Sequence, residues 1–345
     1  MNSSDPVKYY SHDLKHQVMI TVWVIVLAII VLNTVSTTAL MCFKLVSSDF
    51  RDSIAEIITS AGNDFEMLFW QILLLFLDPD NTPNATGAAS IIAVICSLPI
   101  FLMLRGKKLL TKDITEIRSP VKPLFILQLF LVAMAAQLIY TLVAAGLNAL
   151  LEPFGIDITE LLNEGMKSLK TPMGLLYGML IGPICEEIIF RGAVLRSLER
   201  FGGNFAIVIS SLLFGLYHVF TIQALYAFLL GLILGYAAQR YSLLWAILLH
   251  ILLNSFATGM DTLPETAGNV IMVGFFVVGI ALLILLVRRG VLKEQLVNGK
   301  PYQIAVGDTP IPYTPRPFRL AFSTISFIIY FIAVLIIGIL MILFL

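Results

Sequence analysis

Charged residues are scarce in this sequence, and their scarcity excludes most classes of soluble protein. They make up 13% of the 345 residues, about half of the roughly 25% that is usual for soluble domains. Hydrophobic residues make up 59%, which is more than a soluble core of this size requires. Lys and Arg balance Asp and Glu, so the formal net charge is zero. This balance gives no indication of a nucleic-acid partner.

Cysteine is too sparse to organise the fold. The three cysteines, Cys42, Cys96 and Cys185, lie in or at the ends of apolar runs, a position typical of packing residues rather than of a disulfide framework. The first apolar run also lacks the pattern of a cleavable signal peptide, because it is too long and has no clear small-residue cleavage site. We therefore expect this first run to remain in the protein as a helix.

Long apolar runs are what the sequence has in abundance. About 20 apolar residues in a helix span a bilayer, so the runs predict an all-α, polytopic membrane protein with about nine transmembrane helices. The run 65–77 is too short to span and is predicted to be interfacial or re-entrant, and 156–169 has the pattern of an amphipathic surface helix. The nine predicted spans are 18–43, 88–104, 123–150, 172–198, 204–221, 223–239, 241–259, 268–287 and 319–343.

Basic residues are unevenly distributed among the loops between these runs. The segments 105–122 and 288–319 are rich in Lys and Arg, whereas 255–267 contains neither. Because cytoplasmic loops carry the excess of Lys and Arg, we expect an integral membrane protein with its N-terminus in the cytosol. The chain then divides into an N-terminal transmembrane and loop region (1–122), a core (123–287), and a cytosolic linker followed by a C-terminal transmembrane helix (288–345).

Four ionisable residues and one amide lie well inside the predicted spans: Glu186, Glu187, His218, His250 and Asn254. Such residues are costly in a membrane and indicate a functional site. If the fourth span continues to about residue 200, a rise of 1.5 Å per residue places all of them roughly 14 to 21 Å from the cytosolic helix ends. They can therefore share one layer near the middle of the bilayer.

Helical spacing gives the two adjacent glutamates different surroundings. Glu187 and Arg191 are four residues apart and can form an ion pair along one helix face, which would fix this helix. Glu186 points about 100° away and is left free to act as a general base on water. His250 and Asn254 are also four residues apart, so both can face one cavity.

A purely structural interpretation of these residues is also possible. A single buried histidine is usually a satisfied structural residue, and the Glu187–Arg191 pair neutralises itself. Phe214 and His218 share a helix face, and we expect the aromatic ring to stack one turn below the imidazole. Several costly groups at one depth on three helices nevertheless favour catalysis or ion handling.

Several protease signatures are missing from the spans. The sequence has no His-Glu-x-x-His helix, no Gly-x-Ser-Gly motif and no Asp within a predicted span, which argues against that type of zinc helix, a serine nucleophile and an aspartyl dyad. Three other motifs occur in order: E-E-x-x-x-R at 186–191, F-x-x-x-H at 214–218 and H-x-x-x-N at 250–254. Together they resemble the CAAX-protease and bacteriocin-processing (CPBP, or Abi) family of intramembrane metalloproteases, over about residues 172–259.

This resemblance implies roles for individual residues and an intramembrane glutamate- or metallo-endopeptidase activity. Glu186 would activate water, with His218, His250 and Asn254 placed around the reacting centre and Asn254 acting as an oxyanion donor. A zinc ion held by Glu186, His218 and His250 is possible, and a metal-free mechanism in which the glutamate activates water is the alternative. The Glu187–Arg191 pair would support the site.

The expected function is therefore hydrolysis of a peptide bond in or next to the membrane. The implied partners are a peptide or membrane-protein substrate and the lipid bilayer, and the implied location is a bacterial cell membrane. Two other classes of protein stay open. One is a non-catalytic membrane partner or bacteriocin-immunity protein of the same fold, and the other is an ion-coupled transporter, which would more often show two related halves with broken helices.

Overall fold

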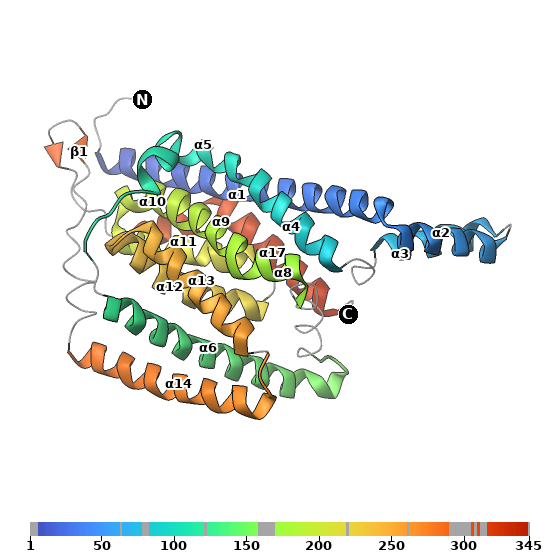
Figure 1. Ribbon diagram of the computed structural model, residues 1–345. Coiled ribbons are helices and arrows are strands. Elements are labelled where there is room, and N and C mark those ends of the chain that lie inside the picture. Colours follow the sequence, from blue (N-terminus) through green and yellow to red (C-terminus); the bar gives the residue numbers. More distant parts are fainter. Residues whose placement is uncertain are drawn as a thin grey trace.

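The computed structural model describes residues 6–62, 64–77, 83–120, 123–157, 170–218, 221–260, 262–289, 305–306, 309–310 and 316–343. In these residues the chain is a helical bundle (Figure 1). The strands are β1 (Ala305–Val306) and β2 (Thr309–Pro310), a two-residue antiparallel pair. The all-α class is therefore confirmed, whereas most of the predicted amphipathic segment 156–169 and of the linker 298–317 lies outside the described residues.

The helices follow the order of the apolar runs. The first part of the chain forms α1 (Pro6–Val46), α2 (Ser48–Ala61), α3 (Phe65–Leu77), α4 (Pro83–Ser97), η2 (Leu98–Phe101), α5 (Leu102–Arg105), η3 (Leu109–Asp113), α6 (Pro123–Leu151) and η4 (Glu152–Phe154). The fourth predicted span forms α8 (Pro172–Leu176), η6 (Tyr177–Ile181), α9 (Gly182–Glu187), η7 (Ile188–Leu195), α10 (Arg196–Leu198) and η8 (Glu199–Phe201). The remaining helices are α11 (Gly203–Tyr217), α12 (Thr221–Arg240), α13 (Leu243–Met260), α14 (Glu265–Arg288), α16 (Pro317–Phe322) and α17 (Ile325–Leu343).

Among the described residues, several of the nine predicted spans form helices that are long and apolar enough to cross a membrane. Six helical segments are of this kind: Lys8–Val46, Asn84–Arg105, Pro123–Phe154, Pro172–Phe201, Leu243–Met260 and Thr266–Arg288. The spans predicted at α11, α12 and α17 also form helices, but they do not belong to these six. Among the described residues, Gly203–Tyr217 (α11) and Ile325–Leu340 (in α17) are shorter apolar helices.

The longest helix, α1, extends beyond the bundle. Its 41 residues correspond to about 62 Å at 1.5 Å per residue, roughly twice the thickness of a bilayer hydrocarbon core. Figure 1 shows α2 and α3 continuing past the other helices at the far end of α1. The buried Lys44 ammonium donates to the Leu75 carbonyl near the C-terminus of α3, 3.3 Å away, and so ties this projection to α1.

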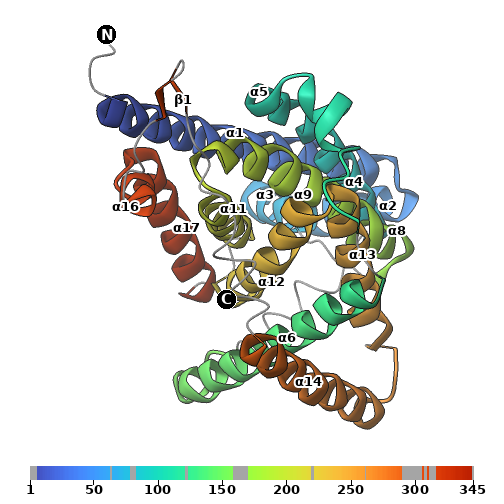
Figure 2. The ribbon, with the colours of Figure 1, turned by 90° about the vertical axis from the view of Figure 1, so that its left-hand side faces the viewer.

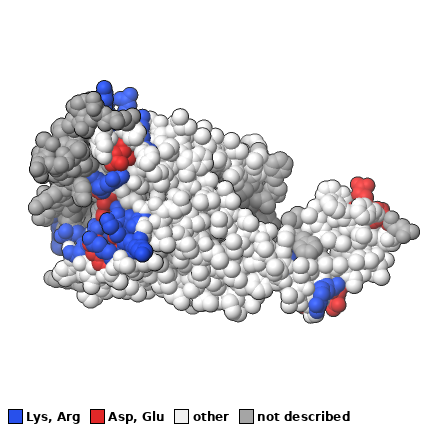
Figure 3. All heavy atoms as spheres, turned by 90° about the horizontal axis from the view of Figure 1, so that it is seen from above, with Lys and Arg blue, Asp and Glu red and all other residues white. Residues whose placement is uncertain are grey.

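Charged side chains gather at one end of the bundle. Figure 3 shows most of the visible Lys and Arg at the end where α1 begins, an uncharged central band, and a smaller mixed group on the projecting α2–α3 segment. An apolar band between polar ends is expected for a bundle that crosses a bilayer. The protein is therefore an integral membrane protein.

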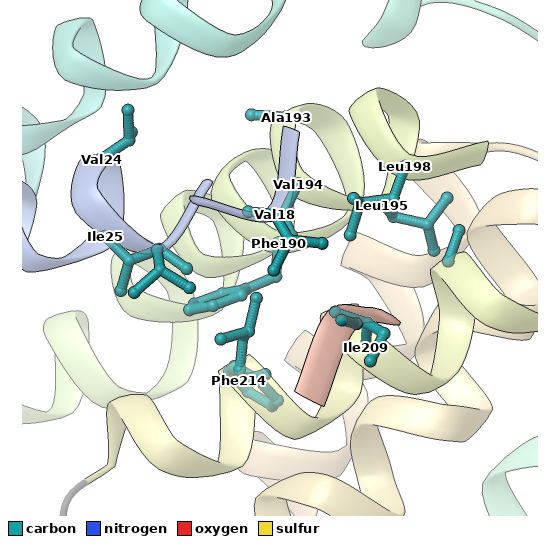
Figure 4. Close-up of a cluster of buried hydrophobic side chains, with 14 of the residues drawn as sticks. Val18, Val24, Ile25, Phe190, Ala193, Val194, Leu195, Leu198, Ile209 and Phe214 are labelled. Atoms are coloured by element: carbon teal, nitrogen blue, oxygen red, sulfur yellow. The ribbon is translucent and has the colours of Figure 1, made fainter. Parts of the chain in front are cut away.

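One hydrophobic core joins helices from distant parts of the chain. Leu14, Val18, Val22 and Ile25 recur at helical spacing on α1 and are buried in the same cluster as Phe190 and side chains of α11 and α17. Figure 4 draws side chains of α1 together with Phe190 and Phe214 in this cluster. Hydrophobic contacts thus connect the predicted regions 1–122, 123–287 and 288–345, and their division into domains stays a prediction.

The pairing of α6 with α14 depends on one glycine, which gives a first testable prediction. A Cβ atom added at Gly279 would overlap the backbone carbonyl of Leu131, whereas a Cβ at Gly274 on the same helix would meet nothing within 4 Å. We expect Gly279→Ala to lower the free energy of unfolding by about 1–3 kcal/mol, the usual cost of overpacking. Thermal unfolding in detergent measures the effect, with Gly274→Ala as the matched control. Equal melting temperatures for the two variants would contradict the packing argument.

Candidate active site

The helix that carries the two glutamates is not a continuous α-helix. It begins at the N-cap Thr171, whose side chain accepts from the Gly174 N–H at 3.1 Å. It then changes to π-helix over Tyr177–Ile181 and again over Ile188–Leu195, with the short α-helix Gly182–Glu187 between them. Single π turns inside α-helices are frequent at functional sites, so Glu186 and Glu187 lie between two irregular segments.

Pro183 gives a local cause for the first irregular segment. A proline inside a helix lacks an N–H and clashes with the carbonyl four residues before it. In this helix the Gly182 N–H bonds to the Tyr177 carbonyl, and Pro183 has no N–H to offer, so the Gly178 carbonyl loses its usual donors. Asn254 replaces them, because its side-chain Nδ2 donates to Gly178 O at 2.9 Å.

Glu187 is the centre of the buried polar cluster. Its Oε1 accepts from Arg191 Nη1 at 2.9 Å and is also 2.9 Å from His250 Nδ1. The Glu187–Arg191 ion pair was predicted from the sequence, whereas the contact with His250 was not. A carboxylate only accepts hydrogen bonds, so Nδ1 of His250 carries a proton and its Nε2 is directed elsewhere.

Arg191 is fully buried and has three kinds of partner. Besides the ion pair, its Nη2 donates to the Gly231 carbonyl at 3.3 Å, and its Cζ lies 4.4 Å from the centre of the Phe214 ring. Burial of a charge is tolerated only when it is paired and hydrogen-bonded. Arg191 Nε and Glu187 Oε2 are nevertheless buried without a hydrogen-bond partner among the described residues. The cluster therefore contains two buried polar atoms that make no hydrogen bond to these residues.

Glu186 has a more open position than its neighbour. Its side chain is 15% exposed, whereas that of Glu187 is 0% exposed. Glu186 Oε2 lies 3.8 Å from His250 Nε2, which is too long for a direct hydrogen bond. A water molecule or a substrate atom can bridge two polar groups at this separation.

His218 belongs to the same neighbourhood through Phe214. Its Nδ1 is 2.9 Å from the Phe214 carbonyl, and because a carbonyl only accepts, Nε2 is the free nitrogen. The Phe214 ring lies 4.8 Å from the His218 ring and 6.0 Å from the His250 ring. Both contacts are edge-to-face, so the predicted stacking of Phe214 on His218 is wrong. Among the described residues no hydrogen bond joins His218 to Glu186 or His250.

The structure therefore groups the predicted residues unequally. Arg191 and His250 are each hydrogen-bonded to Glu187, Glu186 lies 3.8 Å from His250, and Asn254 donates to the Gly178 carbonyl, eight residues before Glu186. Two contacts were not predicted from the sequence: that of the Phe214 ring with the Arg191 guanidinium, and the hydrogen bond from Asn254 to the Gly178 carbonyl. The proline at 183 was the available signal for the latter.

The described side chains do not form a ready-made zinc site. Structural and catalytic zinc sites need at least three converging protein ligands, and no group of three or more His, Cys, Asp and Glu side chains in the described residues meets this requirement. The bond of His250 Nδ1 to Glu187 leaves Nε2 of His250 available, as it is in histidines that bind a metal through the other ring nitrogen. Zinc binding by Glu186, His218 and His250 therefore stays a prediction.

Comparisons with known proteins match the part of the chain that carries these residues. Residues 168–256 match the family model described as "Type II CAAX prenyl endopeptidase Rce1-like". The chain is 32% identical over 95 residues to "Putative membrane peptidase YdiL" of Bacillus subtilis (strain 168). That alignment covers 27% of this chain and 39% of the relative, so the chain matches less than half of the relative's length.

No solved structure matches this chain. The matched segment nevertheless contains all three motifs in their predicted order and the side chains that the structure brings together around His250. Residues 168–256 therefore match the Rce1-like, type II CAAX prenyl endopeptidase family model, in agreement with the family that the motifs resemble.

Proposed function

We propose that this protein is an integral membrane endopeptidase that hydrolyses a peptide bond in or next to the bilayer. The observation that carries this proposal is the separation of 3.8 Å between the partly exposed Glu186 carboxylate and His250 Nε2, beside a buried Glu187–Arg191 pair. This arrangement offers a place for one water molecule between a base and an imidazole. The match of residues 168–256 to a peptidase family supports the same reaction class.

In the proposed reaction Glu186 acts as the general base. It takes one proton from water as the water oxygen bonds to the peptide carbonyl carbon. The carbonyl oxygen becomes an oxyanion, and the C–N bond breaks as the proton held by Glu186 passes to the leaving amine. No group other than water is consumed.

The remaining residues have supporting roles. Glu187 holds Nδ1 of His250, as a carboxylate orients the histidine of a catalytic triad, so that Nε2 faces the reacting atoms. Asn254 donates one amide hydrogen to Gly178 O. Its second amide hydrogen can be donated to the oxyanion, because a side-chain amide has two N–H donors. His218 would contact the substrate or water through its free Nε2.

The proposed substrate is inferred from the reaction class and from the name of the matched family. A peptide or membrane protein is the proposed partner, and a prenylated CAAX peptide is one candidate because the matched family carries that name. We propose a bacterial cell membrane as the location, because the matched relative is bacterial. We propose a cytosolic N-terminus because the basic end of the bundle contains the start of α1.

The test is hydrolysis by purified protein in liposomes. Prenylated and unprenylated forms of one peptide are supplied in water enriched in heavy oxygen, and the products are analysed by mass spectrometry. We expect cleavage with one heavy oxygen in the new carboxylate. Intact peptides in every condition would favour the non-catalytic partner, and ion flux without cleavage would favour the transporter.

Metal content gives a separate prediction for the same preparation. Because the described side chains do not converge as a zinc site, we expect the cleavage rate to survive treatment with a chelator. Elemental analysis before and after chelation is the measurement. About one zinc per chain, lost together with activity and absent from His218→Ala, would instead support the zinc set Glu186, His218 and His250.

A further inference from the structure

An ion-pair network lies at the basic end of the bundle, where the loop after α5 crosses the ends of other helices. The loop is anchored first by Arg105, whose Nε and Nη2 each donate to the Asp113 carboxylate at 2.8 Å. Asp113 and Leu109 are almost fully buried. The loop then reaches α13, where Ile117 and Ser242 form an isolated antiparallel β-bridge.

Arg118 is the residue in this loop that connects the most elements. Its Nη1 and Nη2 bind the two Glu199 oxygens at 2.6 and 2.9 Å, a bidentate ion pair. Nη1 also donates to the Gln239 carbonyl at 3.3 Å, and the Arg118 backbone N–H donates to the Tyr241 carbonyl at 2.7 Å. One residue therefore joins the end of the Glu186-bearing helix to the turn between α12 and α13.

Neighbouring charges strengthen this connection. Arg196, on the Glu186-bearing helix, donates to Glu199 at 3.2 Å and to the Ala238 carbonyl at 3.4 Å. Glu116 accepts from Arg118 Nε at 3.0 Å. Burial acts to raise the pKa of the Glu116 carboxyl, but the hydrogen bond and charge of Arg118, together with the charges of Arg196 and Lys112, lower it overall. Arg118 thus sits in a network rather than in an isolated surface pair, which would have little effect.

The two helix ends held by Arg118 belong to the two helices that build the site. Glu187 lies twelve residues before Glu199, about 18 Å along one helix, and His250 lies eight residues after Ser242, about 12 Å along the other. The Glu187–His250 hydrogen bond of 2.9 Å and the Glu186–His250 separation of 3.8 Å both cross between these helices. A small relative slide of the two helices changes both distances, since packed helices move as rigid units.

We infer that Arg118, outside the matched segment 168–256, is a positioning residue that sets the register of the Glu186 helix against the His250 helix. The inference rests on the proposed function for its effect on catalysis. It acts through Glu199 and the α12–α13 turn, and Arg118 touches no reacting atom. Displacements of about 1 Å at a reacting centre can reduce a rate by a factor of about 100.

The experiment compares Arg118→Ala, Arg118→Lys and the control Lys108→Gln, which alters an exposed charge in the same loop. Steady-state cleavage in liposomes gives kcat and KM, and hydrogen exchange is followed in peptides covering 196–202 and 236–242. We expect Arg118→Ala to lower kcat about 10- to 100-fold with a much smaller change in KM, and to speed exchange in both peptides. Arg118→Lys keeps the charge but not the bidentate geometry, so its kcat should be intermediate, and Lys108→Gln should match the wild type.

Two outcomes overturn the inference. Unchanged exchange in both peptides for Arg118→Ala would show that Arg118 does not hold the helix ends. Faster exchange with a wild-type kcat would show that the network has no effect on the site. A wild-type protein that cleaves nothing would refute the proposed function instead, and the exchange measurement alone still decides whether Arg118 fixes the two helix ends.

Discussion

Glu186→Gln is expected to abolish cleavage while leaving the fold intact. Glutamine has nearly the same shape but cannot take a proton from water, and removal of a general base costs about 10²- to 10⁴-fold in rate. The side chain is partly exposed, and the His250 imidazole is 3.8 Å away and keeps its hydrogen bond to Glu187, so the loss of the Glu186 charge leaves no buried partner unpaired. Cleavage by purified variant and wild type in liposomes, beside thermal unfolding, measures both effects.

The control for this experiment is Glu56→Gln, which makes the same chemical change at an exposed glutamate of α2. It should cleave at the wild-type rate. A Glu186→Gln variant that also cleaves at the wild-type rate would contradict the assignment of Glu186 as the general base. A variant that has lost its cooperative unfolding would show that Glu186 is structural instead.

Glu187→Leu is expected to destabilise the protein far more than Glu186→Gln does. It removes the carboxylate shared by Arg191 and His250 and leaves the Arg191 charge buried without its counterion. Breaking one partner of a buried ion pair typically costs about 3–5 kcal/mol. We therefore expect a large fall in melting temperature in detergent and a low yield of folded protein.

A second variant separates stability from activity. In Glu187→Leu combined with Arg191→Met, both buried charges are replaced by apolar groups of similar size, a change that is often neutral for stability. The double variant should regain most of the melting temperature lost in Glu187→Leu. It should remain inactive, because His250 Nδ1 still lacks its acceptor. Full activity in the double variant would show that Glu187 does not orient His250.

Much of this arrangement was available from the sequence. Apolar runs give the all-α membrane class because a helix must satisfy its own backbone in lipid. The spacing of Glu187 and Arg191 gives their ion pair because residues four apart share a helix face. Gly202, which follows Phe201 and has a φ of +131°, ends the fourth span close to residue 200, as the sequence argument assumed. The predicted depths of the polar residues, which were counted from that end, therefore rest on a correct helix boundary.

Other features depended on contacts between distant segments. Spacing within one helix cannot show that Glu187 also binds His250, 63 residues away, or that Phe214 lies over Arg191. The sequence predicted that Phe214 stacks on His218, whereas the contact is edge-to-face, since a ring's orientation is set by neighbours such as Phe190, 5.0 Å away. Nor does loop composition reveal that Arg118 reaches Glu199.

The sequence by itself therefore determined which residues are ionisable inside the membrane and which of them pair along one helix. Only the tertiary structure decided that the adjacent Glu186 and Glu187 contact opposite nitrogens of the same imidazole, at 3.8 and 2.9 Å. The physical reason is that covalent spacing fixes directions around one helix axis. The distance between two helices is set by all the side chains packed between them.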